Sequence, residues 1–184
     1  MGRRTGASRG RKLRPAQKPP SPVTPRPLTP FERELTTKRR GELSELAFAL
    51  AAARNGFGIS KPFGDSERYD IILDPSQCNP PNSGARPRLV RVQVKSSTSL
   101  LYGLYHVSIQ RSLRGRVVPY RLSEIDFIAA YVIPEDSWFL FPFPHIHGRS
   151  SLLLSPKRRR RHHPYDGYRE AWRLLREPDG IEFA

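Results

Sequence analysis

The chain has a single cysteine, Cys78, among 184 residues, so an internal disulfide and any metal site with several cysteine ligands are excluded. Long apolar segments are also missing. The longest uncharged apolar runs, residues 46–53 and 127–133, fall well short of the roughly 20 residues that a transmembrane helix needs. The N-terminus carries arginines but lacks the apolar segment of a secretory signal. We therefore expect a protein of a reducing compartment, the cytoplasm, that is neither secreted nor embedded in a membrane.

Acidic residues are missing where the chain begins. Residues 1–30 contain eight Lys/Arg, seven Pro and no Asp or Glu, and the whole chain carries a net charge of +15. So few apolar residues and so much proline leave too little burial to offset chain entropy, which predicts a disordered basic head over residues 1–30. Residues 31–156 are only mildly basic and are expected to form one folded domain. Residues 157–184 are expected to form a basic C-terminal extension with a possible helix.

A helix is predicted for residues 38–54. Thr36 or Thr37 can cap its N-terminus, and Asn55-Gly56 ends it. Apolar residues recur with helical spacing and are expected to face the core: Leu43, Leu46, Ala47, Leu50 and Ala51.

Short apolar or alternating segments after this helix predict several strands. They span residues 69–73, 89–95, 105–110, 125–133 and 138–141. The first two are expected to pair antiparallel, and residues 168–176 are expected to form a closing helix with Trp172 and Leu175 facing inward. The fold class is therefore α+β: a mixed, mostly antiparallel sheet backed by an N-terminal helix and a C-terminal helix.

Polar side chains interrupt two of the predicted strands. Because side chains alternate along a strand, Arg91, Gln93 and Lys95 share one face of residues 89–95. Asp70 lies among apolar residues of the preceding strand, where a carboxylate is costly unless it is paired, hydrogen-bonded or bound to a metal. Glu42 lies on the flank of the apolar face of the helix, from which it could point towards the sheet.

Two carboxylates, an amide and an amine that converge suit metal-assisted phosphodiester hydrolysis. Mg²⁺ usually takes one or two carboxylates with water and substrate phosphate, so Asp70, the Gln93 side-chain oxygen and Glu42 are candidate ligands. Mn²⁺ is expected to substitute for it. Lys95 can orient or help to deprotonate the attacking water and offset charge in the transition state.

The ordered set of Glu42 on a helix, Tyr69-Asp70, and Gln93-Val94-Lys95 resembles the PD-(D/E)XK nuclease superfamily. It is similar to the small bacterial branch of that superfamily related to group I intron homing endonucleases and to Holliday-junction resolvases, over roughly residues 36–143. The resemblance implies a restriction-endonuclease-like fold. It also implies that Asp70 and Gln93 bind metal, that Lys95 assists the water, and that Glu42 acts through metal-bound water.

The sequence departs from the family pattern at two positions. Tyr69 stands where the family often has proline before the aspartate. Gln93 replaces the more usual acidic residue, and the loss of a negative charge should weaken Mg²⁺ binding. The related homing-endonuclease branch also shows Gln-x-Lys, so this departure does not exclude activity. It leaves open a protein that retains the nuclease fold without cleaving DNA.

Simpler interpretations stay open for several of these residues. Glu45 is an alternative to Glu42, although the plainer interpretation is a solvated helix residue paired with a nearby arginine. Asp70 could pair with Arg68 or Arg91 instead of binding a metal.

The remaining polar candidates carry weaker signals. His145 and His147 lack a third ligand at suitable spacing and are expected to be ordinary loop residues. Ser96 and Ser97 follow Lys95, where they could touch a phosphate or simply end the strand. The aromatic residues of 138–143 are expected in the core rather than on a base-stacking surface.

Clustered cations are expected to contact the phosphates of a nucleic acid without reading its sequence. These candidate nucleic-acid-binding residues are Arg3, Arg4, Arg9, Arg11, Lys12 and Arg14 in the head, Arg111, Arg114 and Arg116 near the predicted cleft, and Lys157, Arg158, Arg159, Arg160 and Arg161 near the C-terminus.

The favoured hypothesis is a Mg²⁺-dependent DNA endonuclease that acts on duplex or branched DNA, cytoplasmic and associated with the bacterial nucleoid. A homodimer is possible, because cutting both strands with one site per chain favours two-fold symmetry. The alternative is a non-catalytic nucleic-acid-binding protein with a degenerate nuclease fold. A weaker hypothesis is a ribosome-associated basic protein.

Overall fold

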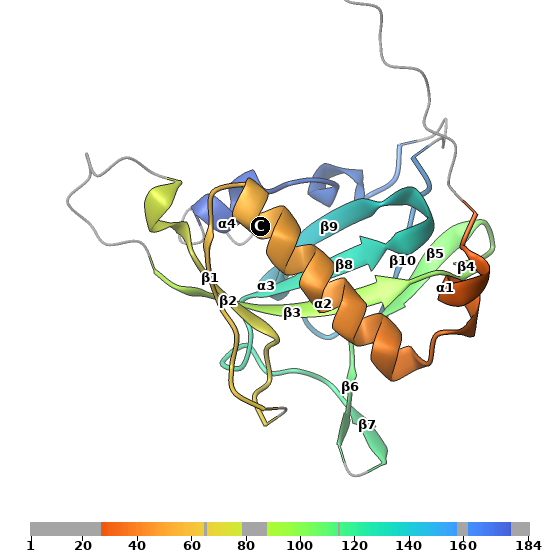
Figure 1. Cartoon of the computed structure of the whole chain (residues 1–184), viewed down its shortest axis with the longest axis horizontal. Helices are drawn as coiled ribbons and strands as arrows, with labels where there is room; N and C mark the ends of the chain where they lie inside the picture. Colours follow the sequence, from red (N-terminus) through yellow and green to blue (C-terminus); the bar gives the residue numbers. More distant parts are fainter. Residues whose placement is uncertain (1–26, 65, 79–87, 114, 158–161, 178–184) are drawn as a thin grey trace, which may run out of the picture.

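The computed structural model describes residues 27–64, 66–78, 88–113, 115–157 and 162–177 (Figure 1). Its helices are α1 (Pro30–Glu34), α2 (Thr37–Arg54), α3 (Phe143–Ile146) and α4 (Arg173–Arg176), and short 3₁₀ turns are η1 (Pro75–Gln77), η2 (Ile133–Glu135) and η3 (Asp166–Tyr168). The strands are β1 (Gly58–Ser60), β2 (Ile71–Asp74), β3 (Val90–Ser97), β4 (Leu100–Leu101), β5 (Leu104–Ser108), β6 (Arg111–Leu113), β7 (Arg116–Val118), β8 (Phe127–Val132), β9 (Ser137–Pro142) and β10 (Ser151–Leu154).

A five-stranded sheet in the order β1-β2-β3-β8-β9 forms the centre of the molecule. Three of its pairings are antiparallel, including the predicted pair of β2 with β3, and only β3 and β8 run parallel. A parallel pair needs a crossover connection, and here the crossover carries β4, β5, β6 and β7 instead of a helix. The predicted α+β class with a mixed, mostly antiparallel sheet is confirmed.

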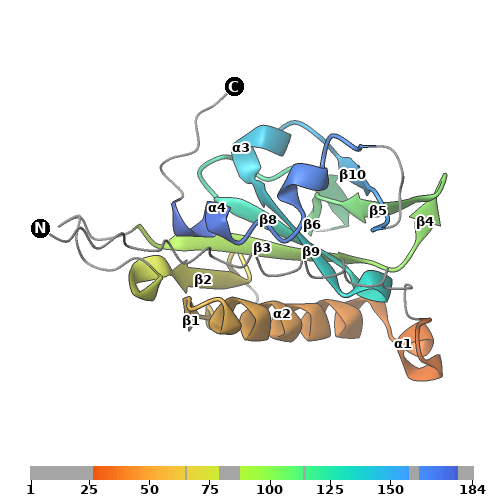
Figure 2. The same cartoon turned by 90° about the horizontal axis from the view of Figure 1, so that it is seen from above.

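The central sheet lies between two layers (Figure 2). Helix α2 covers one face, where Val90, Val92 and Val94 of β3 pack against Phe48. The small sheet β10-β5-β4 and α3 cover the other face, where Ile128 of β8 belongs to a second apolar cluster. Alternation along β3 therefore buries its valines beneath α2 and directs the residues between them to the opposite face. The aromatic residues of β9 are buried, as expected from the sequence.

Helix α2 begins and ends where its capping residues predict, but its buried face is centred on other residues than expected. Thr36 caps it by accepting the Arg39 N–H at 3.2 Å, and Asn55 caps its C-terminus. Its fully buried apolar side chains are Phe48 and Ala52, whereas the predicted core residues Leu46 and Leu50 are 61% and 54% exposed. The expectation was wrong for Leu46 and Leu50, because apolar residues of 46–53 occur on both faces of the helix, whereas Ala47 and Ala51 pack against the core as expected. The large Phe48 ring decides the orientation by packing against Trp138 and Trp172.

The C-terminal segment is less helical than its pattern predicts. Only Arg173–Arg176 is α-helical, because Glu170 adopts a positive φ of 49° just before it. The Glu170 carboxylate accepts the Trp138 N–H and the Trp172 Nε1–H, which ties this segment to β9. Trp172 and Leu175 face the core as expected.

Near the N-terminus, the structure contains a helix that was not predicted, and it describes little of the predicted basic head. The sequence analysis missed α1, although Thr29 and Glu32 form a complete capping box there. Most of the expected basic head, residues 1–26, lies outside the described residues. Within the described ranges, no helix combines the length and apolarity required to cross a membrane.

Candidate active site

The candidate site lies where β2 separates from β3. The pairing of the two strands begins with Ile71 opposite Val92, and the Asp70 N–H donates to the Val92 carbonyl at 3.0 Å. Beyond this point β2 no longer pairs with β3, and the side chains of Asp70 and Gln93 hydrogen-bond to the β3 backbone instead. The Asp70 carboxylate accepts the Val94 N–H at 2.8 Å, and the Gln93 amide donates to the Val94 carbonyl at 3.3 Å. The backbone groups that are left unpaired where the two strands separate thus hold both side chains in place.

Asp70 and Gln93 are joined directly. The Gln93 Nε2–H donates to Asp70 Oδ2 at 2.5 Å, and Gln93 is only 8% exposed. Oδ2 thus accepts both hydrogen bonds of this carboxylate. Among the described residues, Asp70 Oδ1 and Gln93 Oε1 have no hydrogen-bond partner. Two oxygens of the kind that hard cations prefer are therefore left uncommitted on side chains that contact each other.

The environment of Asp70 favours binding a proton or a cation. Burial raises the pKa of this carboxyl from 3.8 to about 6, the Glu45 charge adds to the rise, and the Val94 N–H, the Lys95 charge and the Gln93 amide oppose it. Neither arginine considered in the sequence analysis pairs with Asp70: Arg68 contacts Glu124, and Arg91 forms its ion pair with Asp126.

Lys95 lies on the face of β3 away from α2, as the alternation predicts. Its ammonium donates to the Gln110 carbonyl at 3.1 Å and lies 5.4 Å from the centroid of the Tyr120 ring. Burial lowers the pKa of Lys95, while the Asp70 charge opposes this effect. A lysine with a lowered pKa can give up its proton more readily than an exposed one, which suits a residue that assists an attacking water.

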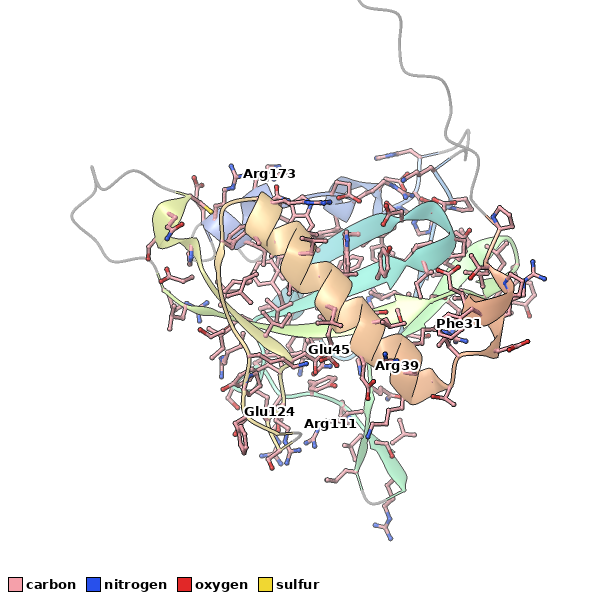
Figure 3. The ribbon with its side chains drawn as sticks, in the orientation of Figure 1. Phe31, Arg39, Glu45, Arg111, Glu124 and Arg173 are labelled. Carbon is pink, nitrogen blue, oxygen red and sulfur yellow. The ribbon has the colours of Figure 1, made fainter. Side chains whose placement is uncertain are left out.

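The two helix carboxylates differ in their surroundings. The Glu42 side chain is 43% exposed and pairs with Arg39 at 2.9 Å along the helix. Glu45 is more buried, pairs with Lys61 at 2.7 Å, and its charge acts on Asp70. Figure 3 shows Glu45 beside the central sheet and Arg39 nearer the start of α2. The structure therefore brings Glu45, the alternative in the sequence analysis, into electrostatic contact with Asp70.

An open cleft connects these acidic side chains. It has a volume of about 580 Å³, and its polar lining includes Glu42, Glu45, Lys61, Glu67 and Asp70. It lies on the α2 side of Asp70, whereas Gln93 and Lys95 approach Asp70 from the other side of the sheet. Asp70 therefore stands between an acidic cleft and a basic, aromatic face.

The donor set fits a hard cation that keeps much of its water. No cluster of three or more His, Cys, Asp or Glu with metal-binding geometry occurs in the described part of the chain. The uncommitted oxygens of Asp70 and Gln93, with one helix carboxylate nearby, match the few protein ligands that Mg²⁺ takes at phosphate-processing sites. His145 contacts the Tyr168 hydroxyl at 3.0 Å and lies outside this set.

Tyr120, which the sequence analysis did not single out, links Lys95 to two further charged residues. Burial raises the pKa of Tyr120, and the Asp70 charge adds to that rise while Arg111 opposes it. The Arg111 guanidinium lies 5.9 Å from the centroid of the Tyr120 ring and pairs with Glu124 at 3.3 Å (Figure 3). No sequence signal marks Tyr120, because only the crossover between β3 and β8 brings it to Lys95.

The expected nucleic-acid-binding residues are only partly described. Arg111 and Arg116 belong to the β6–β7 hairpin, and the Lys157 backbone and side chain both contact Glu135. Ser97 is buried and hydrogen-bonds the Ser99 backbone, which fits a strand end. The other candidates lie outside the described residues: Arg3, Arg4, Arg9, Arg11, Lys12, Arg14, Arg114, Arg158, Arg159, Arg160 and Arg161.

Comparison with known proteins supports one interpretation of this geometry. The family model described as PD-(D/E)XK endonuclease matches residues 35–175. Among solved structures, a bacterial homing endonuclease, I-Ssp6803I, is 33% identical to the chain and superposes with a TM-score of 0.63. The match covers 79% of this chain and 96% of that one. No curated protein matches the chain.

Proposed function

Because the chain belongs to the PD-(D/E)XK endonuclease family, we propose that it is a metal-dependent DNA endonuclease whose site is Asp70, Gln93 and Lys95 with a carboxylate of α2. The observation that carries this proposal is the arrangement at the β2–β3 separation. There a half-buried carboxylate of raised pKa offers an uncommitted oxygen beside a buried amide, and a half-buried lysine follows that amide two residues later.

The proposed reaction is hydrolysis of a phosphodiester. A water oxygen forms a new bond to phosphorus, the bond from phosphorus to one sugar oxygen breaks, and that oxygen leaves with the electron pair and takes up a proton. The products are a phosphate monoester and a sugar hydroxyl. Lys95 orients the water, accepts or shares its proton, and offsets charge on the phosphoryl oxygens. Mg²⁺ or Mn²⁺ held by Asp70 and Gln93 would supply Lewis-acid charge at the phosphate.

The decisive experiment is cleavage of supercoiled plasmid and of a four-way junction in Mg²⁺, Mn²⁺ or EDTA. Asp70→Asn and Lys95→Ala should each lower the single-turnover rate by a factor of a hundred or more while the protein still binds DNA. Asp136→Asn is the matched control, because Asp136 is an exposed aspartate at the β8–β9 turn. Parallel loss of cutting and binding in the site variants would count against these roles.

The helix carboxylate is assigned by comparing Glu42→Gln with Glu45→Gln. Both remove one charge from the same helix and the same cleft. We favour Glu45 because its charge acts on Asp70, and so we expect Glu45→Gln to lower the rate at least tenfold more than Glu42→Gln. The reverse order would return the role to Glu42, as the family resemblance implies.

Metal binding has a readout that does not require cutting. Millimolar Mg²⁺ or Mn²⁺ should raise the Tm of the wild-type protein, because a ligand that binds only the folded state stabilises it. Asp70→Asn should remove this shift, and Asp136→Asn should retain it. An equal shift in all three proteins would mean that the metal binds elsewhere.

A second candidate function rests on Gln93. An amide in place of an acid removes one negative charge from the proposed metal site, which favours a nuclease fold that binds nucleic acid without cutting it. That function predicts DNA binding that is the same in Mg²⁺ and in EDTA and unaffected by Lys95→Ala. It becomes the better assignment if no metal supports cleavage.

We also propose that the protein acts as a homodimer on DNA, in the cytoplasm of a bacterial cell at the nucleoid. One site per chain cuts one strand, so two sites related by two-fold symmetry are needed to cut both strands together. Direct linearisation of plasmid without an accumulating nicked form, at a protein concentration where light scattering gives a dimer mass, would support this assembly. Nicking by a monomer would contradict it.

A further inference from the structure

The β6–β7 hairpin stands apart from the rest of the fold. Its three residue pairs form a two-stranded sheet that joins neither of the other two sheets, and Figure 1 shows it projecting beyond the body of the molecule. Gly115 in its turn has a φ of 76°. An isolated two-stranded hairpin is marginally stable in water, so contacts at its base must hold this one in place.

The surface of the hairpin is basic and apolar. Residues 109–121 contain four arginines and no acidic residue. Val117 is 67% exposed and Leu113 is 40% exposed, while Arg116 is exposed at the register position opposite Leu113. Cations on such a ribbon can pair with phosphates, and apolar side chains at its tip can contact thymine methyl groups.

Both roots of the hairpin contact the proposed catalytic lysine. Gln110, directly before β6, accepts the hydrogen bond from Lys95 through its carbonyl oxygen. Tyr120, two residues after β7, has its ring 5.4 Å from the Lys95 ammonium. The pairing of Arg111 with Glu124 further fixes the base of the arm. The hairpin therefore extends from the point where the phosphodiester is attacked.

We propose that the β6–β7 hairpin enters the major groove of duplex DNA beside the scissile phosphate and determines where the enzyme cuts. The inference rests on the proposed function and deepens it by naming duplex DNA as the substrate. A two-stranded ribbon fits a groove about 12 Å wide and about 8.5 Å deep. Three residue pairs extend about 10 Å at roughly 3.4 Å a residue, so the tip of the arm reaches the base edges.

The test compares wild type with two variants. Arg116→Ala/Val117→Ser alters the exposed side chains of the arm, and replacement of residues 112–117 by Gly-Gly removes it. The matched control is Arg173→Ala/Leu50→Ser, because Arg173 and Leu50 are also exposed but lie on α4 and α2. Figure 3 shows Arg173 at the opposite end of the view from Arg111.

Two readouts separate this inference from the proposed function. The first maps cut positions on plasmid by sequencing the ends: the arm variants should cut at least tenfold more slowly at the preferred positions of the wild type and spread over other positions. The second needs no cutting. In EDTA, at saturating protein, the wild type and control should protect guanine N7 in the major groove from methylation by dimethyl sulfate, and the arm variants should not.

Two outcomes would overturn the inference, and a third would overturn only the proposed function. Unchanged cut positions and unchanged N7 protection in the arm variants would exclude the groove. Conversion of a dimer to a monomer by loss of the arm, with cut positions retained, would make the hairpin a contact between two copies of the chain. If the wild type does not cut but N7 protection still depends on the arm, the endonuclease assignment fails while the groove contact stands.

Discussion

The environment of Asp70 lowers the stability of the fold but leaves one carboxylate oxygen able to bind a ligand. The same burial that raises its pKa to about 6 costs stability whenever the carboxylate is ionised. Two hydrogen bonds on Oδ2 offset only part of that cost, and Oδ1 receives none from the described residues. This is expected of a functional carboxylate, because an oxygen that is fully satisfied by the protein has little to offer a ligand.

The pH dependence of unfolding tests this interpretation. The folded protein holds the Asp70 proton more tightly than the unfolded chain, so this group lowers the free energy of unfolding as pH rises from about 4 through about 6. In EDTA, Asp70→Asn should be more stable than wild type at pH 8, by up to about 3 kcal/mol, and much closer to it at pH 4. Urea denaturation of both proteins at both pH values measures the difference. A variant that is less stable than wild type at pH 8 would contradict the prediction.

Several site residues were predictable from local pattern and others were not. The alternation of β3 places Gln93 and Lys95 on one face, and an aspartate in an apolar strand is conspicuous in any sequence. The choice between Glu42 and Glu45 depends on how α2 rotates against the sheet, which periodicity alone left open. Tyr120 belongs to no recognisable sequence pattern. It lies near Lys95 only because the crossover of about thirty residues between β3 and β8 folds back to it.

At the scale of elements, the ends of α2 are set by local chemistry. Thr36 and Thr37 both suit a cap by residue type, and the structure gives that role to Thr36, whose hydroxyl oxygen accepts the Arg39 N–H. Both threonines are exposed. The two positions therefore form a matched pair for testing a single capping hydrogen bond.

Thr36→Ala should lower the free energy of unfolding by about 1 kcal/mol, because an N–H at the start of the helix loses its partner. Thr37→Ala should change it by less than about 0.5 kcal/mol, since alanine is a good residue for the first turn. Urea denaturation at constant m-value measures both effects. Equal effects at the two positions would mean that the cap is shared or lies one residue later.

The buried face of α2 was the main feature of the fold that the sequence did not predict correctly. Local pattern could not choose between faces that both carry alanine and leucine or phenylalanine, and the choice follows from long-range packing. Phe48 touches Trp138 of β9 and Trp172 beside α4, two elements distant in sequence. The strands were predicted more closely, apart from the short β1, β4, β6, β7 and β10.

Substitutions on the two faces of α2 should differ in proportion to burial. Phe48→Ala should cost about 3–5 kcal/mol, because it empties a fully buried site between two tryptophan rings. Leu50→Ala should cost less than about 1 kcal/mol, because the side chain is more than half exposed. Guanidinium denaturation decides between them. A large loss of stability at Leu50 and a small loss at Phe48 would favour the orientation that the sequence pattern suggested.

At the scale of the whole molecule, the charges of the folded domain largely pair with one another, whereas the excess positive charge lies mainly near the N-terminus. Residues 31–156 carry sixteen basic and twelve acidic residues, and within the described structure many of these form ion pairs, such as those of Arg91 with Asp126 and of Arg111 with Glu124. More than half of the net charge lies in residues 1–30. Sequence-independent attraction to phosphates should therefore come mainly from the tails, and cutting from the folded domain.

Deletion of residues 1–26 should separate these two tasks. It removes eight Lys/Arg, and the slope of log Kd against log salt should fall by about 0.9 for every phosphate of duplex DNA that these residues neutralise. Binding at low salt should weaken and become less salt-dependent, while the single-turnover rate at saturating protein should stay within about threefold of wild type.

Two full-length variants serve as controls, because this attraction depends on charge and not on sequence. A variant with these eight residues changed to Gln should behave like the deletion. A variant whose residues 1–26 are shuffled, with the same charge, should behave like wild type. An unchanged salt slope would place the nonspecific binding on the folded domain, and a fall in the saturated rate would mean that the head takes part in cutting.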